Sequence, residues 1–80
     1  MIEQDIVFEN TTSSDNQVER TINFPVLLSS SDDCFIQVTR ETTQSNSSKN
    51  YVWVKTHTES YCTFVYRQND YGNVYINVRN

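Results

Sequence analysis

The chain has 80 residues, of which 36% are apolar and 12% aromatic, and its formal net charge is −4. A chain this short buries only roughly 60% of the surface that its unfolded form exposes, so residues 1–80 make one small domain and leave no room for a second. The excess of acids disfavours general binding to duplex nucleic acid, where neutralising phosphates supplies most of the non-specific affinity.

The first half of the chain predicts three strands. Ile2 to Phe8 forms the first, and a polar stretch without apolar residues follows it as a loop. Residues 18–24 alternate between apolar and polar, which is the period of a half-buried strand. Pro25 cannot donate to a ladder, so pairing stops or bends there. After a turn at 29–33, Cys34 to Thr39 alternates again, with one set of side chains on each side. Residues 40–50 contain no apolar residue and predict a mobile loop.

The second half contains three alternating runs, at 51–57, 61–67 and 73–79. We expect Thr58 to Ser60 to close the first hairpin, with Val54 opposite Phe64 and Trp53 opposite Val65. Asp70 to Gly72 would close the second, because the only glycine of the chain suits a positive φ after a type I turn.

The two predicted turns make these runs a three-stranded C-terminal meander with two distinct faces. The core face then collects Val52, Val54, Thr56, Cys62, Phe64, Tyr66, Val74, Ile76 and Val78. The other face collects Tyr51, Trp53, Lys55, His57, Tyr61, Thr63, Val65, Arg67, Tyr75, Asn77 and Arg79.

Strand-forming residues dominate the whole chain, which has no alanine and only two leucines. We therefore predict an all-β, mainly antiparallel domain of five to six strands, arranged as a small sandwich or a partly open barrel.

Groups that could perform catalysis or bind a metal are few. His57 is the only histidine, and neither Glu59 nor Cys62 stands at a spacing that specifies a catalytic site. We interpret Cys34 and Cys62 as buried reduced thiols, with a disulfide as the alternative. Two cysteines and one histidine do not make a zinc site, so we expect no metal. Because catalytic groups are also few, we expect no enzyme activity and no cofactor.

The aromatic and basic face is the candidate binding surface, with Tyr51, Trp53, Lys55, Arg67, Tyr75 and Arg79 as its site residues. Trp, Tyr and Arg are enriched at protein interface hot spots, so we expect a protein partner. Aromatic rings among cations also suit single-stranded nucleic acid, which is the alternative partner. A third interpretation packs this face against another layer or a second copy, as in a homodimer or a structural self-associating subunit.

Size and acidity favour a small accessory or inhibitor protein of the kind that phages and mobile elements encode. The N-terminal segment lacks the basic start and long apolar core of a secretory signal, and no run of about 18 apolar residues occurs. We therefore expect no membrane association and a cytoplasmic location, in the host cytoplasm if the protein is viral.

Overall fold

Six strands build the protein, and no helix occurs in the parts of the chain that the structure describes. The computed structural model describes residues 2–12, 14–42, 49–69 and 71–80. Their strands are β1 (Glu3–Phe8), β2 (Gln17–Asn23), β3 (Phe35–Arg40), β4 (Val52–His57), β5 (Tyr61–Arg67) and β6 (Val74–Arg79). All six predicted strands are confirmed. Nothing in these ranges forms a helix long and apolar enough to cross a membrane.

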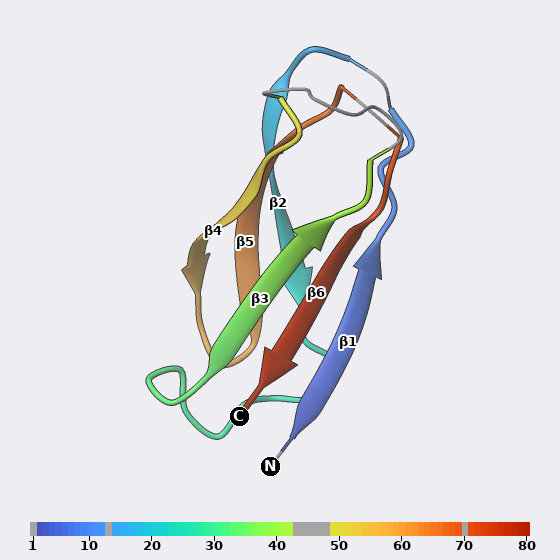
Figure 1. Ribbon diagram of the computed structural model, residues 1–80. Helices are drawn as coiled ribbons and strands as arrows, with labels where there is room; N and C mark the ends of the chain where they lie inside the picture. The colour runs from blue at the N-terminus through green and yellow to red at the C-terminus, as the bar shows by residue number, and fades with distance from the viewer. Residues whose placement is uncertain (1, 13, 43–48, 70) are drawn as a thin grey trace.

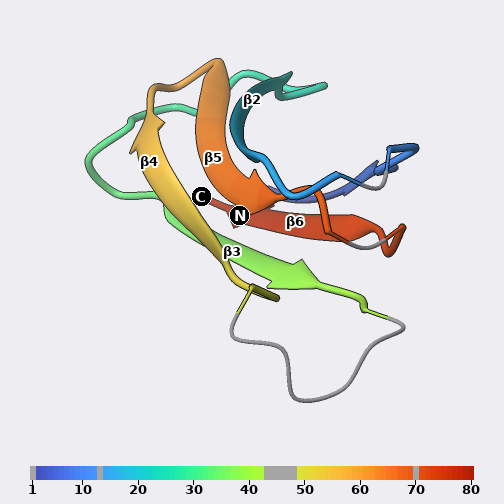
Figure 2. The same cartoon turned by 90° about the horizontal axis from the view of Figure 1, so that it is seen from above.

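The strands form two antiparallel sheets that face each other. One sheet has the order β1-β6-β3 and the other the order β2-β5-β4 (Figure 1). Seen from above, the two sheets approach most closely where β3 lies beside β4 (Figure 2). The all-β antiparallel sandwich is therefore confirmed, and it is closer to two sheets than to a barrel.

The core lies between the sheets and is built from alternate residues of the two central strands. Cys62, Phe64 and Tyr66 of β5 meet the core side chains of β6, Val74, Ile76 and Val78, and all six are fully or almost fully buried. The ring of Phe8 packs edge-on to Phe64 and Tyr66, at centroid distances of 5.4 and 5.8 Å. The predicted core face is thus correct for both central strands.

The predicted hairpin between β5 and β6 is wrong, and with it the C-terminal meander. β5 uses both of its edges, pairing with β2 on one side and β4 on the other, so no edge remains for β6. β6 instead pairs with β1 and β3 in the opposite sheet. The chain has left the first sheet after Gln68, whose N–H donates to Asn16, and joins the second by Asn73, which accepts from Glu41.

Gly72 is needed for a different reason from the predicted one. Its φ does not lie in the left-handed region, and Asp70 of the predicted turn lies outside the described residues. A Cβ at Gly72 would lie 1.6 Å from the carbonyl oxygen of Glu41. The glycine therefore allows two backbones to approach closely where the chain crosses between sheets.

The hairpin of β4 and β5 has the predicted register at its open end, with Trp53 opposite Val65 and Val54 opposite Phe64. A bulge then shifts the register, so that Thr56 lies opposite Thr63 and is exposed, which corrects its place on the core face. The shift arises because the turn is tighter than predicted: the N–H of Thr58 donates to the carbonyl of Tyr61 at 2.8 Å.

The segment after β2 ties the two sheets together at the opposite edge. β2 ends before Pro25, as predicted, and the side-chain amide of Gln4 then pairs with the backbone of Val26. Nε2 of Gln4 donates to the Val26 carbonyl at 2.8 Å, and Oε1 of Gln4 accepts from the Val26 N–H at 2.9 Å. Of the predicted loop at 40–50, Arg40 belongs to β3, and residues 43–48 lie outside the described residues.

Candidate functional site

The six predicted site residues do not share one face of the sandwich. Trp53, Lys55 and Arg67 belong to the sheet β2-β5-β4, and Tyr51 immediately precedes β4. Tyr75 and Arg79 belong to β6 and therefore lie on the outer face of the opposite sheet. The alternation of side chains along each strand was predicted correctly, but the error in strand pairing joined two surfaces that point in opposite directions.

Two side-chain contacts cross the outer face of the sheet β2-β5-β4, one from β4 and one from the residue just before it, and both reach β2. Lys55 of β4 reaches Glu19 of β2 with an Nζ to Oε1 distance of 2.6 Å. The hydroxyl of Tyr51 donates to the side-chain carbonyl of Gln17. Because β5 lies between these two edge strands, both contacts pass over the central strand and hold the face together.

The cations of this face are matched by acids of the N-terminal half. Arg67 lies 3.6 Å from the carboxylate of Asp15 and donates to its backbone carbonyl, and Lys49 lies 2.8 Å from the same carboxylate. The hydrogen bond from Lys49 lowers the pKa of the Asp15 carboxyl; partial desolvation opposes this effect, and the charge of Arg67 reinforces it. The face is therefore less basic than the second half of the sequence suggested.

Trp53 lies on the outside of the sandwich, and its side chain is 47% exposed. Its neighbour Val65 is only 2% exposed, although no strand of the described chain lies over it. Val65 stands between Glu19 and Trp53 in the register, beneath the contact from Lys55 to Glu19. In the described part of the chain no second layer of strands covers Val65, which contradicts the interpretation that packs this face against another layer of the same chain.

The outer face of the sheet β1-β6-β3 is more open. The three strands share one register, so their outward side chains form three rows across the sheet. The rows are Val7, Tyr75 and Thr39; then Asp5, Asn77 and Gln37; then Glu3, Arg79 and Phe35. Val7, Phe35 and Tyr75 are 57%, 52% and 39% exposed, so three large apolar side chains of this face are accessible to a partner.

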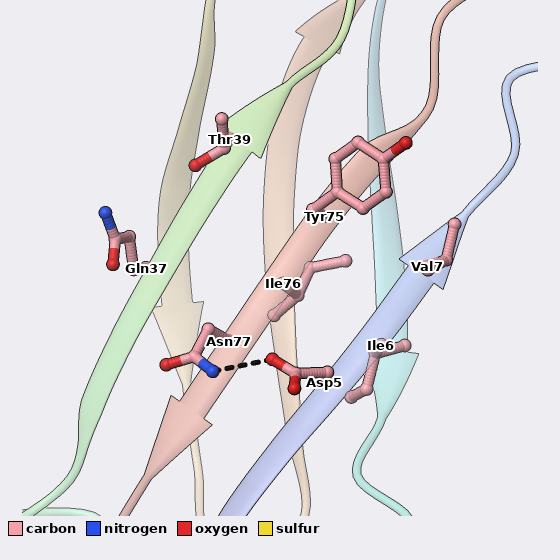
Figure 3. Close-up of a pocket in the computed structure, with 8 residues that line it drawn as sticks. All are labelled: Asp5, Ile6, Val7, Gln37, Thr39, Tyr75, Ile76 and Asn77. Carbon is pink, nitrogen blue, oxygen red and sulfur yellow. Dashed lines mark hydrogen bonds between the residues drawn. The ribbon is translucent and has the colours of Figure 1, made fainter.

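A shallow hollow of about 240 Å³ lies between the first two of these rows. Figure 3 shows the eight side chains around it, which come from all three strands. They are Asp5, Ile6, Val7, Gln37, Thr39, Tyr75, Ile76 and Asn77. Asn77 Nδ2 donates to Asp5 Oδ1 at 2.6 Å, and the hydroxyl of Tyr75 donates to Glu41 Oε2 at 2.9 Å, so one hydrogen bond holds a side chain in place in each of the two rows.

The third row gives the face an aromatic end. The guanidinium of Arg79 lies over the ring of Phe35, 4.4 Å from its centroid. A cation stacked on an aromatic ring in this way is held flat against the sheet. Arg79 forms no ion pair with an acid in the described part of the chain, so the aromatic ring and not a carboxylate fixes its position.

Sequence reasoning missed most of the residues around the hollow. Tyr75 was a predicted site residue, and Asn77 was placed on the same face, but Asp5, Val7, Gln37 and Thr39 were not selected. Their alternation shows that they point outward from their strands. What brings them together is the pairing of β6 with the first and third strands, for which the local pattern contains no signal.

Thiol and imidazole groups meet at the edge where β3 and β4 approach. Cys34 Sγ lies 3.5 Å from His57 Nδ1 and 3.1 Å from the carbonyl oxygen of Ser31, to which the thiol donates. Cys62 is the register partner of His57 and is completely buried, and its burial raises the pKa of its thiol. Both cysteines are free, and no group of three metal-binding side chains occurs in the described ranges.

Comparison with known proteins yields no relative for this chain: no protein family, no curated protein and no solved structure matches it. The geometry of the two outer faces is therefore what indicates a function for this chain.

Proposed function

We propose that this chain is a non-enzymatic protein-binding module, and that its partner docks on the outer face of the sheet β1-β6-β3. The observation that carries the proposal is the hollow on this face, bordered by accessible Val7 and Tyr75. A concave, largely apolar surface with a few oriented polar groups is the usual form of a binding site. Tyrosine is also among the residue types that contribute most to protein interfaces.

The opposite outer face supports docking less well. Lys55 and Tyr51 are engaged by side chains of β2, and a partner that used them would have to break these contacts first. Trp53 remains accessible there, and it serves as the matched comparison in the test below.

A pull-down from a lysate of the source organism or its host tests the proposal with three forms of the protein. They are the native chain, a double variant Val7→Ser with Tyr75→Ser, and the variant Trp53→Ala. We expect the native chain and Trp53→Ala to retain one common partner that the double variant loses, while far-UV circular dichroism shows that all three are folded. Equal recovery by the native chain and the double variant would exclude this face.

We favour the class of small accessory or inhibitor proteins, which cover a functional surface of a larger target. The chain fits this class because it combines small size with an accessible docking face. Absence of enzyme activity belongs to the same proposal. The nearest group to a catalytic arrangement is the pair of Cys34 and His57, and no acid or further nucleophile completes it in the contacts of the described chain.

Single-stranded nucleic acid, the alternative partner, receives less support from the geometry. Its predicted platform is divided between two faces, and Lys55 and Arg67 already face Glu19 and Asp15. Binding of an oligonucleotide that weakens steeply with rising salt would nevertheless favour this alternative. Mass in solution at several concentrations tests the remaining alternative, in which the same surface joins two copies.

A further inference from the structure

The walls of the hollow differ in chemistry from one row to the next. Val7, Tyr75 and Thr39 form the row on one side, and Asp5, Asn77 and Gln37 form the row on the other. An occupant that satisfies both rows needs an apolar stem beside the first and a polar end beside the second. Lysine and arginine side chains have this build.

Asp5 sets the charge that the polar end should carry. Among the described residues that line the hollow it is the only charged one, and its Oδ1 is oriented by the amide of Asn77 at 2.6 Å. The second carboxylate oxygen, Oδ2, receives no hydrogen bond from the described chain and can accept one from a ligand. An ordered carboxylate with one unused oxygen favours a cationic donor, because charge-assisted hydrogen bonds are stronger than neutral ones.

The surrounding charges point the same way. Glu3 lies on the same outer face, and Glu41 contacts Tyr75 at its border. Among the side chains that the structure describes on this face, three carboxylates including Asp5 therefore stand against one cation, Arg79. Arg79 is held over the ring of Phe35 and does not neutralise Asp5. The face as a whole is therefore complementary to a basic segment of a partner.

We propose that the hollow receives a basic side chain, arginine or lysine, from the partner protein. This inference rests on the proposed function and specifies the chemistry of the partner at one point. The stem of the side chain lies against Val7 and Tyr75, and its cationic end donates to Oδ2 of Asp5.

A titration of the ¹⁵N-labelled protein followed by amide chemical shifts tests this assignment. The probes are N-acetyl-arginine methylamide and N-acetyl-citrulline methylamide, which have nearly the same shape but differ in charge. We expect shifts at Asp5, Asn77 and Thr39 with the arginine probe, and about two- to fivefold weaker binding of the citrulline probe, the size expected for one exposed ion pair.

Two variants separate the role of the Asp5 carboxylate from that of overall charge. Asp5→Asn should abolish the preference for arginine over citrulline, whereas Asp32→Asn removes one negative charge from an exposed turn and should leave the preference unchanged. Equal binding of the two probes by the native protein would overturn the inference, and so would a preference that survives in Asp5→Asn. Shifts centred on Trp53 would also overturn it.

The two proposals fail in different ways. If the probes bind equally while the double variant at Val7 and Tyr75 still loses its partner in the pull-down, the docking face stands and the occupant is wrong. If the arginine preference is found but the double variant retains every partner, the hollow has the stated chemistry and the proposed function is wrong.

Discussion

Replacement of Phe64 by alanine is the sharpest test of the fold. Phe64 lies at the centre of β5, is 0% exposed, and contacts the rings of Phe8 and Tyr66 at centroid distances of 5.4 and 5.8 Å. Truncating a fully buried phenylalanine costs about 3 to 5 kcal/mol in free energy of unfolding, through lost burial and the cavity left behind. A domain of this length has only about 4 to 12 kcal/mol in total, so the variant should be near the limit of folding.

The matched control is Phe35→Ala, which removes the same side chain from the outer face of β3. Phe35 is 52% exposed, and the guanidinium of Arg79 lies over its ring. Losing half of its burial and one cation–π contact should cost about 1 to 2 kcal/mol. Urea unfolding followed by far-UV circular dichroism measures both variants against the native chain, with the slope of the free energy on urea checked for constancy.

If Phe64→Ala is unfolded without denaturant, Phe64→Leu keeps most of the apolar volume and should cost less than about 2 kcal/mol. Equal destabilisation by Phe64→Ala and Phe35→Ala would refute the assignment of inner and outer faces. A loss below about 1 kcal/mol for Phe64→Ala would do the same, because no buried phenylalanine is expected to cost so little.

Three other predictions concern the crossing, the thiols and an ion pair. Gly72→Ala should lower the free energy of unfolding by about 1 to 3 kcal/mol in a urea titration, because the added Cβ would overlap the backbone carbonyl of Glu41. A neutral effect would contradict the close approach of these two backbone segments. Iodoacetamide on the native protein should modify Cys34 and spare Cys62, since only Cys62 is fully buried. Mass spectrometry after digestion shows which cysteine carries the label. Equal labelling of both cysteines would show that the core opens. Lys49→Met should raise the pKa of Asp15 in a ¹³C-detected titration. In the native chain folding lowers the pKa of Asp15, so the ionised Asp15 carboxylate contributes its full stabilisation above the unfolded-state pKa. That stabilisation is lost as the pH falls through the folded-state pKa. An unchanged titration of Asp15 in the variant would show that Lys49 is not the cause of the lowered pKa.

The sequence by itself determined where the strands lie and which way their side chains point. Alternation of apolar and polar residues is a local property, because successive side chains of an extended chain point to opposite sides whatever strand lies beside them. Phe64 and Ile76 could therefore be assigned to the core, and Trp53 and Tyr75 to the outside, before any pairing was known. The same reasoning set Trp53 opposite Val65, since one short turn joins their strands.

Tertiary structure alone decided which strands are neighbours. The alternation of β6 fits either sheet equally well, and the choice depends on β2, far away in the sequence, taking the edge of β5 that a hairpin would have used. The side chain of Asp5 consequently meets Asn77 from the other end of the chain, and Tyr75 lies on the far side of the domain from Trp53. A strand has two edges and each accepts one partner, so pairing follows from competition among all strands, which a local pattern does not record.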